Sequence, residues 1–365
     1  MPVNDARLES VITARLLCGP ETLQINLNNS CNLNCIFCWN HSPLQTPPTK
    51  EFLAGRLSDS HLDNVVGSLE RLRPSYVTLS GRGEPLLHPN VRILLSELRR
   101  LTIPVTVHSN GIGGLEPEEF VEYGLATVML NLSAATADGY ERTHPGRGKL
   151  LSRIEERMKR LSGLDDAPEV IILAVIQKTN FTEMAQFVDF AKEVGVKKIV
   201  FKGMELFAGL EELLFNAEEK QQARGYLDAA NARAQQLSID LSDGHLRKLL
   251  TEQKRDGSFS RSMAKGPCYA GWYYLRVTTD GNVMFCCKDK RVGRLQEHRH
   301  GHLDRYSLYQ IWRSPHYHLQ RIAGRDGDIS TGLFDRKCDR CSNYLLNDRI
   351  REDLDRYRKS QGKGF

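Results

Sequence analysis

The sequence predicts an α/β fold: a partial (β/α)6, TIM-like barrel followed by a small C-terminal α+β domain made of a β-hairpin and a helix. Short apolar, β-rich runs alternate with longer helical patterns from residue 23 to about residue 202, as in parallel βαβ units. An Asp280-Gly281 turn between two β-rich runs indicates a hairpin in the last third. The 365 residues suffice for one large domain and one smaller domain.

Six strands and four intervening helices are expected in the first region. The helix over 58–72 illustrates the pattern, because Ser58 is a good N-cap and Leu62 and Val65 share one apolar face. The spacing alone also fits an open doubly wound sheet, and in either architecture ligands bind at the carboxyl ends of the strands. The expected strands are 23–27, 76–80, 105–108, 127–131, 170–176 and 198–201, and the expected helices are 58–72, 91–101, 149–161 and 181–194.

Composition divides the rest of the chain. Residues 206–255 are polar and helical in pattern, and 257–266, rich in Gly, Ser, Arg and Lys, is typical of a linker. The expected segments are an N-terminal lead-in (1–22), the barrel core (23–205), a helical bridge with linker (206–266), the hairpin domain (267–345) and a charged tail (346–365).

Composition also narrows the class of protein. A hydrophobic content of 40%, a charged content of 26% and a net charge of +5 are ordinary for a soluble globular protein of this length, so no nucleic-acid partner is expected. No apolar run approaches the ~20 residues of a membrane span, and residues 1–20 lack the apolar core of a secretory signal. Nine cysteines, mostly clustered, then indicate metal ligation in a reducing, cytoplasmic compartment without a membrane partner.

Three cysteines follow the first expected strand directly. Cys31, Cys35 and Cys38 have the spacing C-x3-C-x2-C. Three thiolates hold three corners of an iron–sulfur cluster and leave the fourth iron open to a small molecule. The alternatives are a zinc knuckle, which usually closes with four ligands in two pairs, and a redox pair, which needs only C-x-x-C.

This motif, with the aromatic Phe37 before its last cysteine, resembles the signature of the radical S-adenosylmethionine (SAM) superfamily. The resemblance implies a [4Fe-4S] cluster whose open iron is chelated by the amino and carboxylate groups of SAM. It implies that one electron, from a flavodoxin- or ferredoxin-type donor, cleaves SAM to methionine and a 5′-deoxyadenosyl radical, which abstracts a hydrogen atom from the substrate.

A glycine-rich turn follows the second expected strand. In Gly81-Arg82-Gly83-Glu84-Pro85 the glycines permit a backbone turn close to a ligand, and the glutamate is an acceptor for an ammonium group. A plain surface turn is the alternative. The turn resembles the G-G-E-P element with which the superfamily binds the amino group of SAM, although Arg82 replaces the second small residue and adds a charge.

The ends of the next strands carry polar residues that resemble SAM-contacting positions of the superfamily. Asn110 follows the third strand, and Asn131 and Ser133 lie at the end of the fourth. Ile176, at the end of the fifth, is a candidate for packing on the adenine, and Gln177 for a hydrogen bond nearby. Turn-forming polar residues are the alternative interpretation.

A second group of cysteines surrounds the expected hairpin. Cys268 precedes it, Cys286 and Cys287 end it, and Cys338-x2-Cys341 lies further on. Four thiolates fill a [4Fe-4S] cluster with no vacant iron, and zinc accepts the same ligands. Adjacent side chains of a strand point to opposite faces, so one of the neighbouring pair binds, and spacing favours Cys286 over Cys287.

This segment resembles the C-terminal auxiliary-cluster domain of radical SAM enzymes, called the SPASM domain, or its shortened "twitch" form. A full SPASM domain has seven cysteines and two clusters, whereas five cysteines are available here. The resemblance therefore implies one auxiliary [4Fe-4S] cluster held by Cys268, Cys286, Cys338 and Cys341. The histidines at 298, 300, 302, 316 and 318 alternate in an arginine-rich stretch, which favours a solvated segment over a metal site.

A radical cluster with a closed auxiliary cluster suggests an oxidoreductase that removes two electrons from its substrate. The main prediction is oxidation of a small-molecule alcohol on an aminocyclitol or sugar. Candidates for substrate contact or proton transfer are Lys202, Glu205, Arg82 and Arg276, with a surface ion pair as the alternative for the first two.

The alternative prediction is a maturase that modifies a peptide or protein by thioether formation, epimerisation or Ser/Cys oxidation. Only 30 residues precede Cys31, too few for a winged-helix domain that binds a leader peptide, which counts against the leader-dependent version. A non-catalytic iron–sulfur scaffold or zinc module is the third possibility, and the open-corner motif argues against it.

Overall fold

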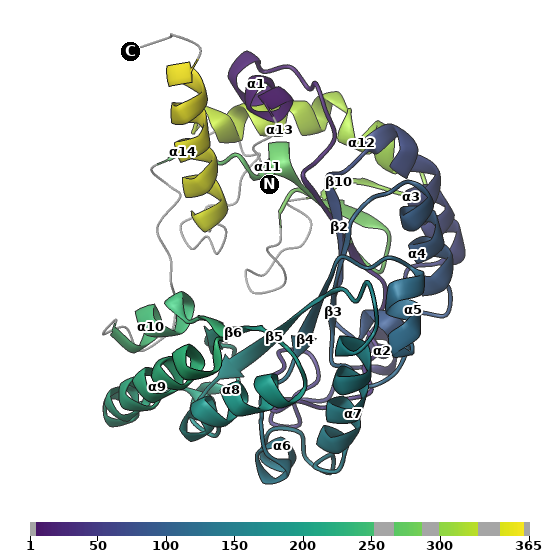
Figure 1. Cartoon of the computed structure of the whole chain (residues 1–365). Helices are drawn as coiled ribbons and strands as arrows, with labels where there is room; N and C mark the ends of the chain where they lie inside the picture. Colours follow the sequence, from purple (N-terminus) through teal and green to yellow (C-terminus); the bar gives the residue numbers. More distant parts are fainter. Residues whose placement is uncertain (1–4, 252–265, 287–298, 328–343, 361–365) are drawn as a thin grey trace.

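A single ten-stranded sheet runs through the described part of the computed structural model, residues 5–251, 266–286, 299–327 and 344–360 (Figure 1). The strand order is β10-β9-β8-β1-β2-β3-β4-β5-β6-β7. Strands β1 to β7 are parallel and in chain order, β8 is parallel to β1, and the β8–β9 and β9–β10 pairs are antiparallel. The strands are β1 Thr22–Asn26, β2 Tyr76–Ser80, β3 Val105–Ser109, β4 Thr127–Asn131, β5 Glu169–Ile176, β6 Lys198–Gly203, β7 Asp240–Ser242, β8 Tyr274–Val277, β9 Asn282–Met284 and β10 Arg299–His302.

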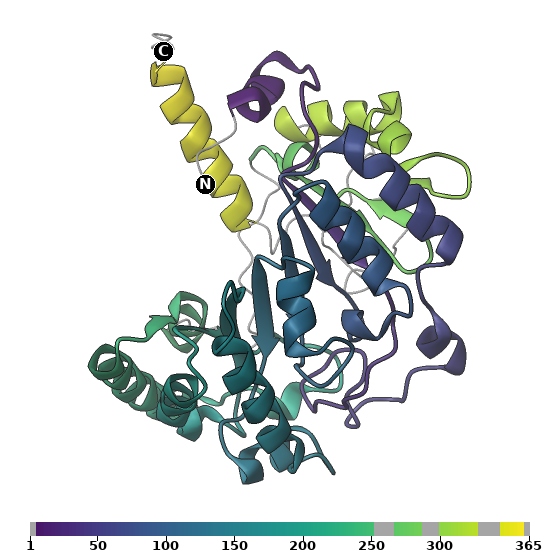
Figure 2. The same cartoon turned by 45° about the vertical axis from the view of Figure 1, so that its right-hand side comes forward.

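The sheet is curved, and helices cover its convex face (Figure 1 and Figure 2). This arrangement confirms the predicted barrel-like α/β fold. The core helices are α2 Lys50–Ala54, α3 Asp59–Leu72, α4 Val91–Arg100, α5 Pro117–Glu122, α6 Ala137–Thr143, α7 Leu150–Ser162, α8 Met184–Glu193, α9 Ala217–Leu237 and α10 Gly244–Thr251, with short 3-10 helices η1 Pro85–Leu87, η2 Phe181–Glu183 and η3 Glu211–Leu213. The remaining helices are α1 Asp5–Thr13, α11 Ala270–Tyr273, α12 Leu308–Trp312, α13 Pro315–Arg325 and α14 Tyr344–Ser360.

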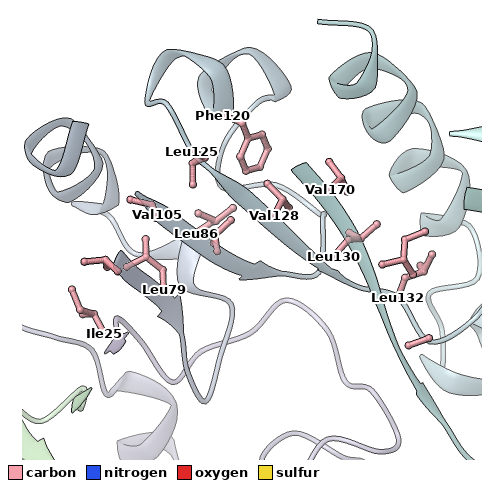
Figure 3. Close-up of a cluster of buried hydrophobic side chains, with 14 of the residues drawn as sticks. Ile25, Leu79, Leu86, Val105, Phe120, Leu125, Val128, Leu130, Leu132 and Val170 are labelled. Carbon is pink, nitrogen blue, oxygen red and sulfur yellow. The ribbon is translucent and has the colours of Figure 1, made fainter. Parts of the chain in front are cut away.

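Apolar residues at every second strand position form the core beneath these helices. Ile25, Leu79, Val105 and Val128 are at most 2% exposed, and Figure 3 shows them in one buried cluster. The side chains between them point to the concave face and are only half-buried. On that face lie Gln24, Thr78, Thr106, His108 and Met129.

The predicted hairpin is present, but it extends the core sheet. Strand β8 pairs in parallel with β1, with Leu23 opposite Leu275 and Ile25 opposite Val277. The side chains of these four residues are fully buried, so the pairing continues the apolar layer of the barrel. The hairpin that carries the auxiliary cysteines is therefore joined to the strand that leads into the first cysteine motif.

Two stretches differ from their predicted character. Strand β7 lies inside the stretch predicted to be helical. Helix α9 ends at Leu237 because Ser238, its C-cap, takes a left-handed conformation, and Asp240 then bonds to the free edge of β6. Residues 346–360 of the charged tail belong to α14, whose Ile350 and Leu354 are buried against α1 and α11. Among the described residues, no helix is both long enough and apolar enough to cross a membrane.

Candidate active site

The first cysteine motif lies in the loop after β1, at the carboxyl edge of the parallel strands. Its backbone is fixed by Ile36 N–H, which donates to the Thr143 carbonyl at 3.0 Å, and by Glu84 N–H, which donates to the Ser30 carbonyl at 2.9 Å. The loop also approaches the glycine-rich turn closely. A Cβ on Gly83 would lie 1.9 Å from the Ser30 carbonyl oxygen, so this position requires glycine.

The three thiols of this loop form a site that favours a cation. Burial raises the pKa of Cys31 to about 11, and it also raises the pKa values of Cys35 and Cys38. The charges of Cys38 and Cys31 raise the pKa of Cys35 further, so the sulfurs lie close enough to repel one another as thiolates. The described cysteines form no disulfide. These three half-buried cysteines fit the corners of a cationic iron–sulfur core, which binds them as thiolates.

Glu84 joins the ends of β2 and β3. Its side chain is buried, Oε1 accepts from Leu86 N–H at 3.3 Å, and Oε2 accepts from Asn110 N–H at 2.8 Å. Burial nevertheless raises the pKa of Glu84 to about 7. A cationic group of a ligand beside this carboxylate would stabilise its ionised form, as the sequence predicts for the amino group of SAM.

Asn110 connects this carboxylate to the cysteine loop. Its Nδ2 donates to Asn32 Oδ1 at 2.7 Å and lies 3.8 Å from Cys31 Sγ, while its Oδ1 accepts from Ile112 N–H at 2.9 Å. Hydrogen bonds from amide groups to the sulfurs of an iron–sulfur cluster change its reduction potential. The structure therefore places Asn110 next to the predicted cluster.

The ends of β4 and β5 lie side by side and include a buried amide without a partner. Ser133 Oγ accepts from Val175 N–H at 3.1 Å, and Asn131 is exposed at the strand end. Ile176 is fully buried. Gln177 is also fully buried, and among the described residues neither its Oε1 nor its Nε2 has a hydrogen-bond partner. An unpaired buried amide costs about 1–3 kcal/mol, so a ligand or water is expected to satisfy Gln177.

Asn180 is a positioning residue that the sequence did not single out. Its Nδ2 donates to the Ser133 and Val175 carbonyls at 2.8 and 2.9 Å, and its Oδ1 accepts from Gln177 N–H at 2.8 Å. It thereby fixes both strand ends. The available signal was an asparagine in the turn four residues after the end of an apolar strand.

The concave face beside the cysteine loop carries a polar network. The Asn26 side-chain amide is oriented with its oxygen toward Arg276. This oxygen accepts hydrogen bonds from Arg276 Nε at 3.2 Å and from Arg276 Nη2 at 2.9 Å. Gln24 accepts from the Tyr274 hydroxyl and donates to Ser80 Oγ at 2.7 Å. Arg276 is buried, so the structure ties this predicted substrate residue into the sheet.

Lys202 lies at the end of β6 near His108 and His245, and these three residues are called the basic cluster. Burial, and next the charge of Lys202, lower the pKa of His108 to about 4. The same two causes lower the pKa of His245, whose Nε2 lies 3.9 Å from Glu205 Oε1. Arg82, another predicted substrate residue, has a different neighbour: its guanidinium lies 5.7 Å from the centre of the Phe52 ring. The structure thus brings Lys202 and Glu205 to one region through two histidines that the sequence prediction missed.

Two of the predicted auxiliary ligands, Cys268 and Cys286, belong to the described residues and lie near each other. Burial raises the pKa of Tyr317, and the charges of Cys286 and Cys268 both add to this effect, so both sulfurs lie near one ring. Cys286 is buried and Cys268 partly exposed. The predicted ligands Cys338 and Cys341, and the alternative Cys287, lie outside the described residues. The described pair fits two corners of a thiolate-bound cluster.

The fold is an open α/β barrel with a three-cysteine loop at its carboxyl edge. An added hairpin carries a second cysteine group. Together these features define an iron–sulfur enzyme of the barrel class. Comparison with known families is consistent with both parts: residues 25–204 match the model of the radical SAM superfamily, and residues 268–342 match that of an iron–sulfur cluster-binding domain, SPASM. The chain belongs to the radical SAM superfamily. Its cofactors are accordingly [4Fe-4S] clusters, one of them auxiliary, and SAM.

Curated relatives include several proteins named for peptide chemistry. The chain is 25% identical to PqqA peptide cyclase of Gluconobacter oxydans, over 73% of this chain and 70% of that protein. It is 24% identical to sporulation killing factor maturation protein SkfB of Bacillus subtilis, over 76% and 63%. GTP 3′,8-cyclase of Syntrophomonas wolfei is also 24% identical, over 75% and 82%.

Solved structures share the fold. SuiB of Streptococcus suis bound to its precursor peptide SuiA has a TM-score of 0.60 at 16% identity, covering 86% of this chain and 70% of that chain. AnSMEcpe with bound AdoMet has a TM-score of 0.57 at 16% identity, covering 93% and 97%.

We expect Glu84→Gln to weaken SAM binding about 10- to 100-fold, because hydrogen bonds to charged groups contribute about 1.5–3 kcal/mol. This prediction takes Glu84 as the acceptor of the N–H groups of the iron-bound SAM amine, and the ionised carboxylate is the stronger acceptor. The pKa of Glu84 is about 7. From pH 6 to pH 8 the ionised fraction rises from about 10% to about 90%. SAM affinity of the reconstituted enzyme, measured by equilibrium dialysis, should therefore rise about 10-fold over this range and stay flat in Glu84→Gln.

Glu141→Gln is the matched control for this measurement. Glu141 is exposed and likewise accepts two backbone hydrogen bonds, from Gly146 and Gly148 at 2.6 and 2.7 Å. This variant should keep both the affinity and its pH dependence. An equally steep pH dependence in Glu84→Gln would show that a group other than Glu84 binds the amino group of SAM.

Proposed function

We propose that this enzyme modifies a peptide or protein, abstracting a hydrogen atom from an amino-acid residue held in the concave face of the sheet. The names of PqqA peptide cyclase and SkfB support a peptide substrate over the small-molecule alcohol that was the main sequence prediction. The resemblance to GTP 3′,8-cyclase keeps a small molecule as the competing substrate class.

The observation that carries the proposal is the open concave face. In the described part of the chain, the edge strands β10 and β7 end the sheet without pairing to each other. Small-molecule sites typically enclose 70–90% or more of their ligand's surface. The concave side chains Gln24, Thr78 and Thr106 are instead only half-buried, and Lys202 is exposed. Such a surface suits an extended chain whose amides need hydrogen-bonding partners.

Lys202, His108 and His245 bind the substrate in this proposal. Lys202 binds a carboxylate or carbonyl of the substrate next to the reacting carbon. Both His108 and His245 have lowered pKa values, which keeps these imidazoles neutral at pH 7, so each offers a ring-nitrogen lone pair as a hydrogen-bond acceptor to the substrate. When bound, SAM and its cluster supply the radical that removes the hydrogen atom. A flavodoxin- or ferredoxin-type protein is proposed as the electron donor.

Deuterium transfer distinguishes the two substrate classes. The reconstituted enzyme is incubated with SAM and dithionite and with one of two pools: peptides built from perdeuterated amino acids, or perdeuterated aminocyclitols and sugars. The proposal expects deuterium in 5′-deoxyadenosine from the peptide pool alone. The unlabelled peptide pool is the control for exchange with solvent. Transfer from the cyclitol pool but not from peptides would instead establish the small-molecule reaction.

A further inference from the structure

We propose that His61, His302 and Asp304 form a binding site for a divalent transition-metal ion such as zinc, which fastens the auxiliary hairpin to the barrel. His61 lies in the first turn of α3, His302 ends β10, and Asp304 lies in the turn that follows. One ligand atom from each residue lies within 4.8 Å of the other two. The sequence interpretation of a solvated histidine segment had no means of including His61, which is 243 residues from Asp304.

The hydrogen bonds of His302 call for a cation at its Nδ1. The ring nitrogen Nε2 lies 2.6 Å from the Asp280 carbonyl oxygen, which only accepts hydrogen bonds, so Nε2 carries the proton. Nδ1 therefore carries the lone pair, and the backbone N–H of Asp304, 3.3 Å away, makes a long hydrogen bond to it that a metal ion would replace. The same Nδ1 lies 2.8 Å from Asp304 Oδ2. A lone pair and a carboxylate oxygen repel at this distance unless a proton or a metal ion joins them.

The second histidine favours a metal ion over a proton. His61 Nε2 lies 2.6 Å from Asp304 Oδ1, so a ring nitrogen faces each oxygen of one carboxylate. The two rings are inclined at 73°, with centres 5.3 Å apart. Two imidazoles and a carboxylate are the ligands of zinc and related transition metals, whereas calcium and magnesium prefer oxygen alone. A metal-bound histidine also usually donates its other N–H to a carbonyl or carboxylate, as His302 does to Asp280.

Two adjustments let the site hold the ion. Ligand atoms on one tetrahedral zinc ion lie about 3.3 Å apart, so the Asp304 carboxylate has to withdraw by about 0.5–0.7 Å. The two imidazole nitrogens, which lie within 4.8 Å of each other, have to come to the same separation. The Asp304 side chain is 64% exposed and free to withdraw, whereas that of His61 is 11% exposed and held in place. Water completes the coordination from the exposed side.

Both parts of the protein hold the ligands in position. A Cβ on Gly281 would lie 2.5 Å from His61 Cε1, so the hairpin turn packs directly on this imidazole. One turn along α3, Asn64 Nδ2 donates to the Leu303 carbonyl at 2.8 Å. An ion here would fix β10 and, through their pairing, β9, which leads into Cys286.

The test measures zinc in the full-length, anaerobically reconstituted enzyme. After equilibration with micromolar zinc and gel filtration, elemental analysis should find about one zinc per chain in addition to the cluster iron. Asp304→Asn and His302→Ala should each reduce bound zinc at least about 10-fold, with iron content unchanged. The control His316→Ala removes an exposed histidine of the same region and should retain zinc. Zinc should raise the Tm of the wild type but not that of Asp304→Asn.

The outcomes that overturn the proposal are distinct from failure of the proposed peptide chemistry, because they are read from zinc and Tm. Zinc absent from the wild type would leave a proton as the cation between His302 and Asp304. Equal zinc in the wild type and Asp304→Asn would indicate an adventitious ion only. If His302→Ala does not fold, the Asp304→Asn result decides, because that carboxylate is exposed and the amide has nearly the same shape.

Discussion

Cys35→Ala abolishes reductive cleavage of SAM, with 5′-deoxyadenosine formation lowered at least about 1000-fold, because the cofactor supplies the whole of this chemistry. Cys35 is the central thiol of the first motif, and the charges of Cys31 and Cys38 both act on it. Two remaining thiolates cannot hold a cluster that exposes one iron. Iron should fall from about eight to about four per chain, measured by iron analysis and by chromatography of 5′-deoxyadenosine under dithionite.

Cys18→Ala is the matched control for Cys35→Ala. Cys18 lies outside both cysteine groups, and its backbone carbonyl accepts from Trp312 Nε1 at 3.2 Å, a bond that alanine preserves. This variant should keep all its iron and its rate of SAM cleavage. Full SAM cleavage by Cys35→Ala would contradict the assignment of the first motif as the site of the radical cluster.

The sequence predicts the barrel core well because its signals are local. The strand at 76–80 and that at 127–131 have the same bounds in the structure as in the prediction. Each is a short β-rich run next to a helix whose start or apolar face can be recognised, such as the one capped by Ser58. The three ligands of the first motif also lie within eight residues, so their proximity needs no knowledge of the fold.

Features that depend on distant contacts were not predicted. The pairing of Leu23 with Leu275 joins the hairpin to the core, and no short-range pattern encodes it. His108 has the same limitation: its strand position was visible, but its proximity to Lys202 requires the curvature of the sheet. Partners on separate elements are set by tertiary packing, which a periodic pattern does not specify.

Cys286→Ala is expected to separate SAM cleavage from product formation. Cys286 lies near Cys268 at the ring of Tyr317. It does not belong to the first cysteine motif, so its loss should leave the radical cluster intact. Iron should fall to about four per chain, while 5′-deoxyadenosine still forms at no less than about half the wild-type rate. Modified product should fall at least about 100-fold, because this prediction assigns the auxiliary cluster as the electron acceptor for the substrate radical.

Cys287→Ala is the sharpest control, because it removes the neighbouring thiol. The sequence prediction assigns one cysteine of the pair to the auxiliary cluster on the basis of strand alternation. In the structure β9 ends at Met284, so the choice between the two thiols is left to this experiment. Cys286 is buried in the apolar core at 9% exposure, at the position that faces Cys268 and Tyr317. Cys287→Ala should therefore keep about eight iron atoms and full product formation. The reverse pattern would assign Cys287 as the ligand, and unchanged product in both variants would refute the role of the auxiliary cluster as electron acceptor.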